Sequence, residues 1–203
     1  MFKKRVFCII FIPAFRAMGL NMTITIDEHI KLEQTAQKHA EGLFVALNAN
    51  RAHLSVFLPW VENMQSVDDF RIYIRNCESM YMEQQEISFV ILLDGEIVGR
   101  IGLHHLDLNN RNAAIGYWLS KHVEGNGIMT RCCKTLINYG FGELGLQRIE
   151  IKAATANLKS QAIPVKLGFK EEGILRQAEL VGGKFLDLIL FAMVRDEWLN
   201  SVK

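Results

Sequence analysis

A turn carrying two glycines joins an aromatic, apolar segment directly to a helical pattern, in the stretch IGYWLSKHVEGNGIMTRCC at residues 115–133. Glycine has no Cβ and tolerates positive φ angles, so Gly125 and Gly127 let another group approach the backbone closely. The first N–H groups of a helix have no partner inside the helix, and they suit an anion. The junction therefore predicts a strand that enters a helix through an anion-binding turn. The alternative is a plain strand-to-helix connection without a ligand.

Around this turn the chain alternates helical and extended patterns. Apolar residues at three- and four-residue spacing predict helices at 36–47, 67–82, 128–144 and 158–167. Apolar or alternating runs predict strands at 23–26, 87–93, 97–106, 113–120 and 148–153, and two more after residue 169. Asp94-Gly95 and Gly182-Gly183 predict hairpin turns. The stretch FLPWVEN at residues 57–63 predicts a loop, which either packs between helices or faces a substrate. This order favours a single α/β domain.

Length, charge and cysteine content narrow the possible partners. A chain of 203 residues suits one domain, and its net charge of +1 leaves no broad basic field for nucleic acid. The four cysteines form no Cys-x-x-Cys and have no histidines at zinc spacing, which predicts a reducing, cytoplasmic location and no metal. The adjacent His104 and His105 are expected to point to opposite faces of a strand, where they would not share a metal.

The N-terminus resembles a secretory signal, because Lys3-Lys4-Arg5 precedes an apolar run at residues 6–15. Pro13 interrupts that run, Arg16 follows it, and no Ala-x-Ala cleavage pattern is present. We therefore expect residues 1–21 to form a tail outside the domain, translated from an early start codon, with Met22 as the original start. Export is the alternative. The domain is expected at residues 22–203, without a membrane-spanning segment.

Three phosphate-binding patterns compete for the glycine turn. A P-loop requires Lys and then Ser or Thr after its last glycine, and Ile128 and Met129 exclude it. A dinucleotide fingerprint requires a third glycine where Thr130 stands. The third pattern is the pyrophosphate loop of acetyltransferases of the GNAT superfamily: Gln or Arg, two residues, Gly, one residue, then Gly or Ala. Residues 124–129, EGNGIM, resemble this loop, with departures at Glu124 and Met129.

A longer resemblance supports the third pattern. Residues 115–179, from IGYWLSKHVEGNGIMTRCC through ATANLKSQAIPVKLGFKEEGILRQAE, are similar to the ribosomal-protein N-terminal acetyltransferases, the RimJ/RimL-like branch of that superfamily. The upstream stretches EHIKLEQTAQKHAEGLF and GEIVGRIGLHHLDLNNRNAAIGYWL also fit, so the resemblance runs from about residue 26 to residue 198. It implies a single-domain GNAT acyl-CoA N-acyltransferase fold with a mixed, mostly antiparallel, splayed sheet flanked by helices.

The resemblance implies that acetyl-CoA lies where the sheet splays, between the strand that ends near Ser120 and the strand at residues 148–153. The pantetheine arm would pair with the first strand like an added strand, and the amide of Leu119 would stabilise the oxyanion. Asn157 is either a helix N-cap, a coenzyme contact or both. The residues implied in coenzyme binding are Trp118, Leu119, Ser120, Gly125, Asn126, Gly127, Ile128, Met129, Thr130 and Asn157.

Two residues are implied in the chemistry. Ser160 would hydrogen-bond to the departing thiolate, and Pro164 leaves the carbonyl of Ser160 without its helical partner, so a bend is expected there. Glu179 would be the base, directly or through water, with Glu150 as the competing carboxylate. At pH 7 an α-amino group is only about 1 kcal/mol from its neutral form, whereas a lysine needs about 4.6 kcal/mol. An N-terminal amine therefore requires only a modest base.

The resulting hypothesis is transfer of acetyl from acetyl-CoA to a primary amine, with the N-terminus of a ribosomal or other protein favoured. Direct attack in a ternary complex is expected, because no cysteine occupies a position that the family uses as an acetyl carrier. One alternative is a small acceptor such as a polyamine, amino acid or antibiotic. Another is a noncatalytic acyl-CoA-binding regulator, since Glu124 places a negative charge beside the diphosphate unless its side chain turns away. A monomer and a homodimer both remain open.

Overall fold

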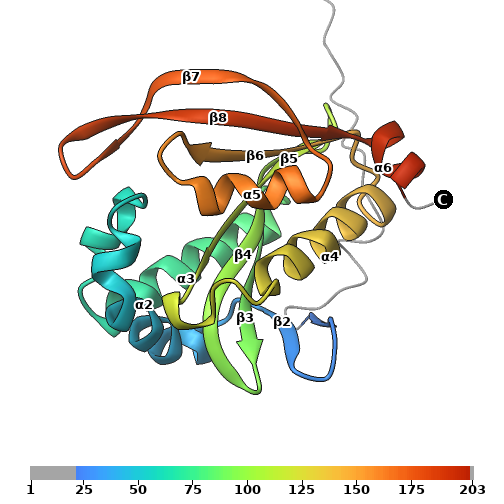
Figure 1. Ribbon diagram of the computed structural model, residues 1–203. Helices are drawn as coiled ribbons and strands as arrows, with labels where there is room; N and C mark the ends of the chain where they lie inside the picture. Colours follow the sequence, from blue (N-terminus) through green and yellow to red (C-terminus); the bar gives the residue numbers. More distant parts are fainter. Residues whose placement is uncertain (1–21, 202–203) are drawn as a thin grey trace, which may run out of the picture.

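The computed structural model describes residues 22–201, as one sheet with helices on both faces (Figure 1). The proposed tail, and with it the signal alternative, lies outside the described residues. The strands are β1 (Thr23–Thr25), β2 (Ile30–Gln34), β3 (Ile87–Leu93), β4 (Glu96–Asp107), β5 (Asn112–Leu119), β6 (Arg148–Ala154), β7 (Lys170–Val181) and β8 (Lys184–Val194). The helices are η1 (Gln37–His39), α2 (Ala40–Leu54), η2 (Pro59–Asn63), α3 (Val67–Met82), η3 (Lys121–Val123), α4 (Ile128–Gly142), α5 (Leu158–Lys166) and α6 (Arg195–Ser201).

The sheet splays at its one parallel junction. Its order is β1-β2-β3-β4-β5-β6-β8-β7, and all neighbours are antiparallel except β5 and β6. That pair spans only Asn112 to Ala114 on β5, opposite Arg148 to Glu150 on β6. Beyond this point β5 stays paired to β4, and β6 stays paired to β8. The predicted opening between the two strands is therefore confirmed, and it begins after Ala114.

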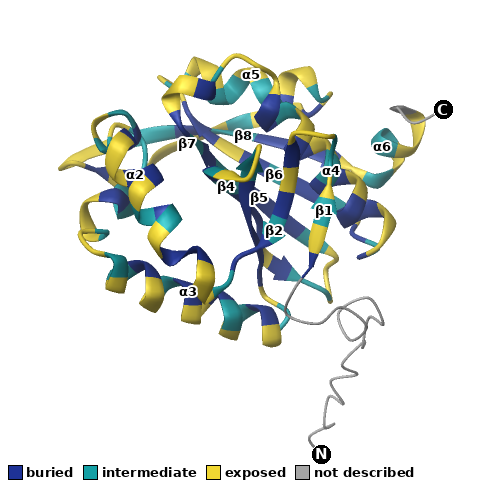
Figure 2. Ribbon diagram, turned by 90° about the horizontal axis from the view of Figure 1, so that it is seen from below, coloured by how far each residue is buried: buried dark blue, intermediate teal, exposed yellow. Residues whose placement is uncertain are grey.

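Two apolar cores lie on opposite faces of the sheet, and Figure 2 shows the buried strands between α2 and α3 on one side and α4 on the other. One core packs α4 and the inner side of α5 against the sheet, with Phe89 and Phe141 fully buried. The other packs α2 and α3 against β3 and β5, around Val90 and Trp118. Neighbouring residues Phe89 and Val90 enter different cores, which explains the continuous apolar run from Phe89 to Leu93 in β3.

A β-bulge overturns the expectation for the two histidines. The register between β4 and β5 shifts after His104, and His105 has a φ of 51°. Their ring centroids consequently lie 4.7 Å apart, so the rings are neighbours and do not point to opposite faces. Across the described residues, no three His, Cys, Asp or Glu side chains are grouped so that they would hold a metal ion. In the same part of the chain, no helix is long and apolar enough to cross a bilayer.

Candidate active site

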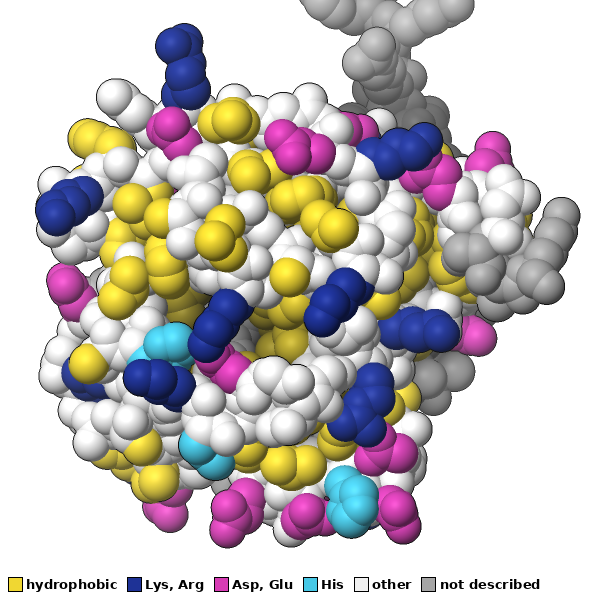
Figure 3. Space-filling view, viewed as in Figure 1, with side chains coloured by type: hydrophobic (Ala, Val, Ile, Leu, Met, Phe, Trp, Pro, Cys, Tyr) yellow, Lys and Arg dark blue, Asp and Glu magenta, His cyan; other side chains and the backbone are white. Residues whose placement is uncertain are grey.

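The opening in the sheet is lined by the end of β5 and the start of α4 on one side, and by β6 and α5 on the other. In Figure 3 a hollow with hydrophobic side chains at its bottom lies between α5 and the start of α4. Basic, acidic and histidine side chains stand around it. The predicted coenzyme and catalytic residues of β5, the glycine turn and α5 all belong to these walls.

The end of β5 has a backbone donor, the N–H of Leu119, that faces the opening. The N–H of Ser120 donates to the carbonyl of Val98 on β4, at 2.7 Å. Because N–H groups along a strand alternate between its two edges, the N–H of Leu119 points away from β4, toward the side where β6 has diverged. Ser120 itself is tied inward, since its hydroxyl accepts from Asn50 Nδ2 at 3.2 Å and its carbonyl accepts from Val123 N at 3.2 Å.

The glycine turn has the shape that its sequence predicts. Gly125 and Gly127 have φ angles of 81° and 71°, in the left-handed region that favours glycine. A Cβ at either position would meet nothing within 4 Å, so the space beside the turn is free. Gly127 is the N-cap of α4 and supplies no side-chain cap, which leaves the first N–H groups of the helix available. Ile128 and Met129 are buried in the core, so only their backbones face a ligand.

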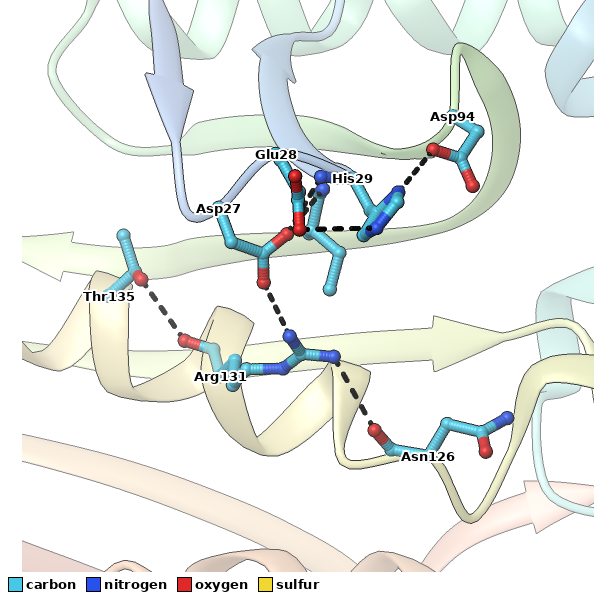
Figure 4. A network of polar contacts seen from close by, with 8 residues as sticks. Asp27, Glu28, His29, Asp94, Asn126, Arg131 and Thr135 are labelled. Carbon is cyan, nitrogen blue, oxygen red and sulfur yellow. Dashed lines mark hydrogen bonds and ion pairs between the residues drawn. The ribbon is translucent and has the colours of Figure 1, made fainter.

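The turn is braced from behind by an arginine of α4 (Figure 4). Arg131 forms an ion pair with Asp27, and its second guanidinium nitrogen donates to the carbonyl of Asn126 at 3.5 Å. The Asp27 carboxylate also accepts from the backbone of His29 and Ile30, which fixes the connection between β1 and β2. The turn is thus anchored to the N-terminal edge of the described fold.

Glu124, at the start of the glycine turn, is held by two basic side chains. Its two carboxylate oxygens contact Nε2 of His53 on α2 and Nζ of Lys159 on α5, each at 2.6 Å. Partial burial raises the pKa of Glu124, but the bonds from Lys159 and His53 outweigh this effect and bring the pKa below its ordinary value. The charge that weakened the family resemblance is therefore neutralised within the protein.

Ser160 is bonded to β5 through a tyrosine. The Tyr117 hydroxyl donates to the Ser160 carbonyl at 3.0 Å and accepts from the Ser160 hydroxyl at 3.2 Å. That carbonyl lacks a helical partner because Pro164 has no N–H. Asn157 is the N-cap of α5, since its side chain accepts from Ser160 N at 3.1 Å. Burial raises the pKa of Tyr117 far above its ordinary range, so its hydroxyl stays neutral.

The two candidate bases have different surroundings. Glu179 lies half-buried on β7, just beyond a bulge at which Gln177 has a φ of 51°, and β7 runs beside η2. Burial raises the pKa of Glu179, which brings a carboxylate closer to the range of an effective base. Glu150, at the end of the β5–β6 pairing, instead accepts from Arg148 Nε at 2.9 Å. The Glu150 carboxylate is therefore already occupied by an ion pair, whereas Glu179 forms no ion pair with any other described residue.

The loop after α2 is packed between the helices, as one of its two interpretations predicts. The Arg51 guanidinium donates to the carbonyls of Val61 and Met64 at 2.7 and 2.6 Å, so the loop is packed firmly between the helices. The Trp60 ring lies 6.5 Å from that of Trp118, in the core that packs α2 and α3, and η2 borders β7. The substrate-facing role of this loop stays a prediction. Trp118 and Tyr117 point to opposite faces of β5, as their strand spacing predicts.

Several site residues were not predicted from the sequence. Asn50, buried on α2, holds both Ser120 and the N–H of Lys121, and the polar residue within an apolar helix stripe was the available signal. His53, Lys159 and Arg131 act through partners 71, 35 and 104 residues away, and nothing in the local sequence indicates such pairs.

The comparisons with known proteins agree with this geometry. Residues 29–170 match the family model described as an acetyltransferase (GNAT) domain. The chain belongs to the GNAT acetyltransferase family. It is 40% identical to YdaF of Bacillus subtilis strain 168, provisionally named a ribosomal N-acetyltransferase, over 87% of this chain and 97% of YdaF. It is 29% identical to the ribosomal-protein-serine acetyltransferase of Escherichia coli K12, over 86% of this chain and 97% of that protein.

A solved structure confirms the fold. The microcin C7 self-immunity acetyltransferase MccE, in complex with acetyl-CoA and AMP, superposes with a TM-score of 0.80 at 28% identity. The match covers 84% of this chain and 95% of MccE. The predicted GNAT fold is therefore confirmed, and the protein is an acetyltransferase.

Proposed function

We propose that this acetyltransferase moves acetyl from acetyl-CoA to the N-terminal amine of a ribosomal or other protein. One observation carries the placement of the coenzyme: β5 parts from β6 where the Leu119 N–H and the uncapped start of α4 both face the gap. The pantetheine arm takes the unpaired edge of β5, and the diphosphate binds at residues 125–130, where the N–H groups of the first turn and the helix dipole stabilise it.

The reaction proceeds by direct attack of the neutral amine on the acetyl carbonyl carbon. The Leu119 N–H stabilises the oxyanion, the C–S bond breaks, and the Ser160 hydroxyl donates a hydrogen bond to the departing sulfur. Glu179 receives the proton that the amine loses, and the thiolate takes up one proton, so the overall reaction is balanced. To donate to the sulfur, the Ser160 hydroxyl gives up its bond to Tyr117, while the bond from the Tyr117 hydroxyl to the Ser160 carbonyl keeps the serine in place.

The described cysteines support direct attack without an acyl-cysteine intermediate. Cys77, Cys132 and Cys133 are all buried. Burial raises the pKa of each of these thiols, that of Cys132 to about 12. Since the thiolate is the nucleophilic form, these residues are poor acetyl carriers.

The choice of an N-terminal acceptor rests on two arguments. The small energetic cost of a neutral α-amine suits a single half-buried carboxylate such as Glu179. YdaF and the Escherichia coli relative also carry names that refer to ribosomal acceptors. The protein substrate is thus favoured over a polyamine, an amino acid or an antibiotic.

Thiol release from acetyl-CoA tests the acceptor class. N-terminal peptides with free serine or alanine are compared with the same peptides blocked at the N-terminus and carrying one lysine, and with spermidine, amino acids and aminoglycosides. We expect the free N-terminal peptides to have the highest kcat/KM, with Glu179→Gln as the low-activity control. A higher kcat/KM for a small amine would overturn the proposed acceptor, and absence of thiol release with every amine would favour the regulator.

A further inference from the structure

We infer that Lys159 is a ligand of the coenzyme's diphosphate, and that Glu124 holds this lysine over the opening until acetyl-CoA arrives. On binding, Lys159 moves from the carboxylate to the diphosphate, while His53 remains on Glu124. The inference rests on the proposed placement of acetyl-CoA between β5 and β6. It adds a residue of α5 to the coenzyme site and gives Glu124 an inhibitory role.

The position of the ion pair supports this exchange. Glu124 belongs to the glycine turn that follows β5, whereas Lys159 belongs to the first turn of α5, which follows β6. Their contact at 2.6 Å therefore crosses the opening from wall to wall. A diphosphate at the start of α4 would lie next to Glu124, within reach of an ammonium group that already spans the same gap.

The exposures of the two side chains favour a change of partner. The Lys159 side chain is 74% exposed and the Glu124 side chain 21%. An ion pair with one largely exposed partner contributes little to stability, so the lysine is released at small cost. The less exposed carboxylate keeps a strong field, which would repel a diphosphate if both basic partners were absent.

His53 makes the exchange possible without an unpaired buried charge. Its Nε2 contacts the second carboxylate oxygen at 2.6 Å, and this bond is independent of the one to Lys159. When the lysine leaves, Glu124 still has a hydrogen-bond partner on α2. The coenzyme then replaces one lysine–carboxylate pair by one lysine–phosphate pair.

Calorimetric measurement of CoA binding distinguishes this exchange of partners from an ion pair that only stabilises the shape of the site. We expect Lys159→Met to weaken CoA binding about tenfold, and Glu124→Gln to strengthen it about three- to tenfold because a repelling charge is lost. Lys166→Met removes the same charge from the last turn of α5 and should leave the Kd unchanged. Acetylpantetheine, which lacks the diphosphate, should bind all four proteins equally.

The opposite signs of the two effects are decisive. If both substitutions weaken CoA binding, the pair only shapes the site and the exchange is wrong. The exchange would also be wrong if the substitutions changed acetylpantetheine binding as much as they change CoA binding. A wild-type protein that binds no CoA would contradict the proposed function itself, whereas normal wild-type binding with no effect of either substitution would contradict this inference alone. Measuring the melting temperature of each variant checks that it is folded.

Discussion

At the scale of single residues, Tyr117 connects the two walls of the opening. Its hydroxyl satisfies the carbonyl that Pro164 leaves free, and it accepts the hydrogen bond of Ser160. The sequence predicted the free carbonyl but not its partner, because the tyrosine lies 43 residues earlier in the chain. The serine's position is therefore set by β5 as much as by its own helix.

Removing this hydroxyl tests its positioning role. We expect Tyr117→Phe to lower kcat about tenfold with little change in the KM for acetyl-CoA, and to lower the free energy of unfolding by about 1–2 kcal/mol. Tyr73→Phe is the matched control, because the buried Tyr73 hydroxyl finds no hydrogen-bond partner among the described residues. A kcat for Tyr117→Phe equal to that of the control would show that Ser160 needs no such support.

The two catalytic candidates should differ in their response to pH. Ser160→Ala and Glu179→Gln are each expected to lower kcat about ten- to a thousandfold. Raising the pH toward 9 should restore part of the Glu179→Gln loss, since more of the amine is then neutral, but not the Ser160→Ala loss. Full activity of Glu179→Gln at pH 7, together with a loss of activity in Glu150→Gln, would identify Glu150 on β6 as the base.

Substitution of Glu179 should also reveal the cost of burying its charge. Its raised pKa means that the folded state favours the protonated carboxyl, so the ionised form is destabilising above that pKa. We expect Glu179→Gln to melt slightly higher than the wild type at pH 7, and the difference to vanish below about pH 4, where both side chains are neutral. A lower melting temperature at pH 7 would indicate that Glu179 stabilises the fold.

At the scale of elements, local signals predicted most helices and strands well. Helix α3 occupies the predicted residues Val67–Met82, because Ser66 and Asp69 form a capping box before a regular apolar stripe. Helix α2 extends beyond its prediction to Leu54, since Asn50 interrupts the apolar pattern yet is buried by its bond to Ser120. The short C-terminal helix α6 was not predicted.

The glycine turn is the element whose prediction is most directly testable. We expect Gly127→Asn to weaken CoA binding at least about tenfold, through loss of backbone bonds to a charged group. Asparagine tolerates positive φ, so the cost in stability should be only about 1 kcal/mol. Gly145→Asn is the control, with a φ of 65° and, like Gly127, no atom within 4 Å of a Cβ. Equal CoA affinities for both variants would show that the diphosphate does not bind at this turn.

At the scale of the whole molecule, the sheet consists of two parts that share a short parallel junction. Three residue pairs join β5 to β6, whereas seven join β6 to β8. The order of strands and the splay followed from the family resemblance, since neither periodicity nor composition indicates which strands pair. A cytoplasmic location and the oligomeric state stay predictions.

A coenzyme that occupies the opening should therefore act on the molecule as a whole. It would contact β5 and α4 on one side and α5 on the other, and so replace part of the missing pairing between β5 and β6. At a CoA concentration about 100 times its Kd, linkage adds about 2.7 kcal/mol to the free energy of unfolding, which for a protein of this size raises the melting temperature by about 5–10 °C.

Hydrogen exchange locates the bound coenzyme: exchange should slow at the Leu119 amide and in the first turn of α4. The β2 amides, far along the sheet order, serve as the control. A thermal shift without protection at Leu119 would mean that CoA binds elsewhere, because an occupied opening covers the Leu119 amide, which the divergence of β6 leaves facing it.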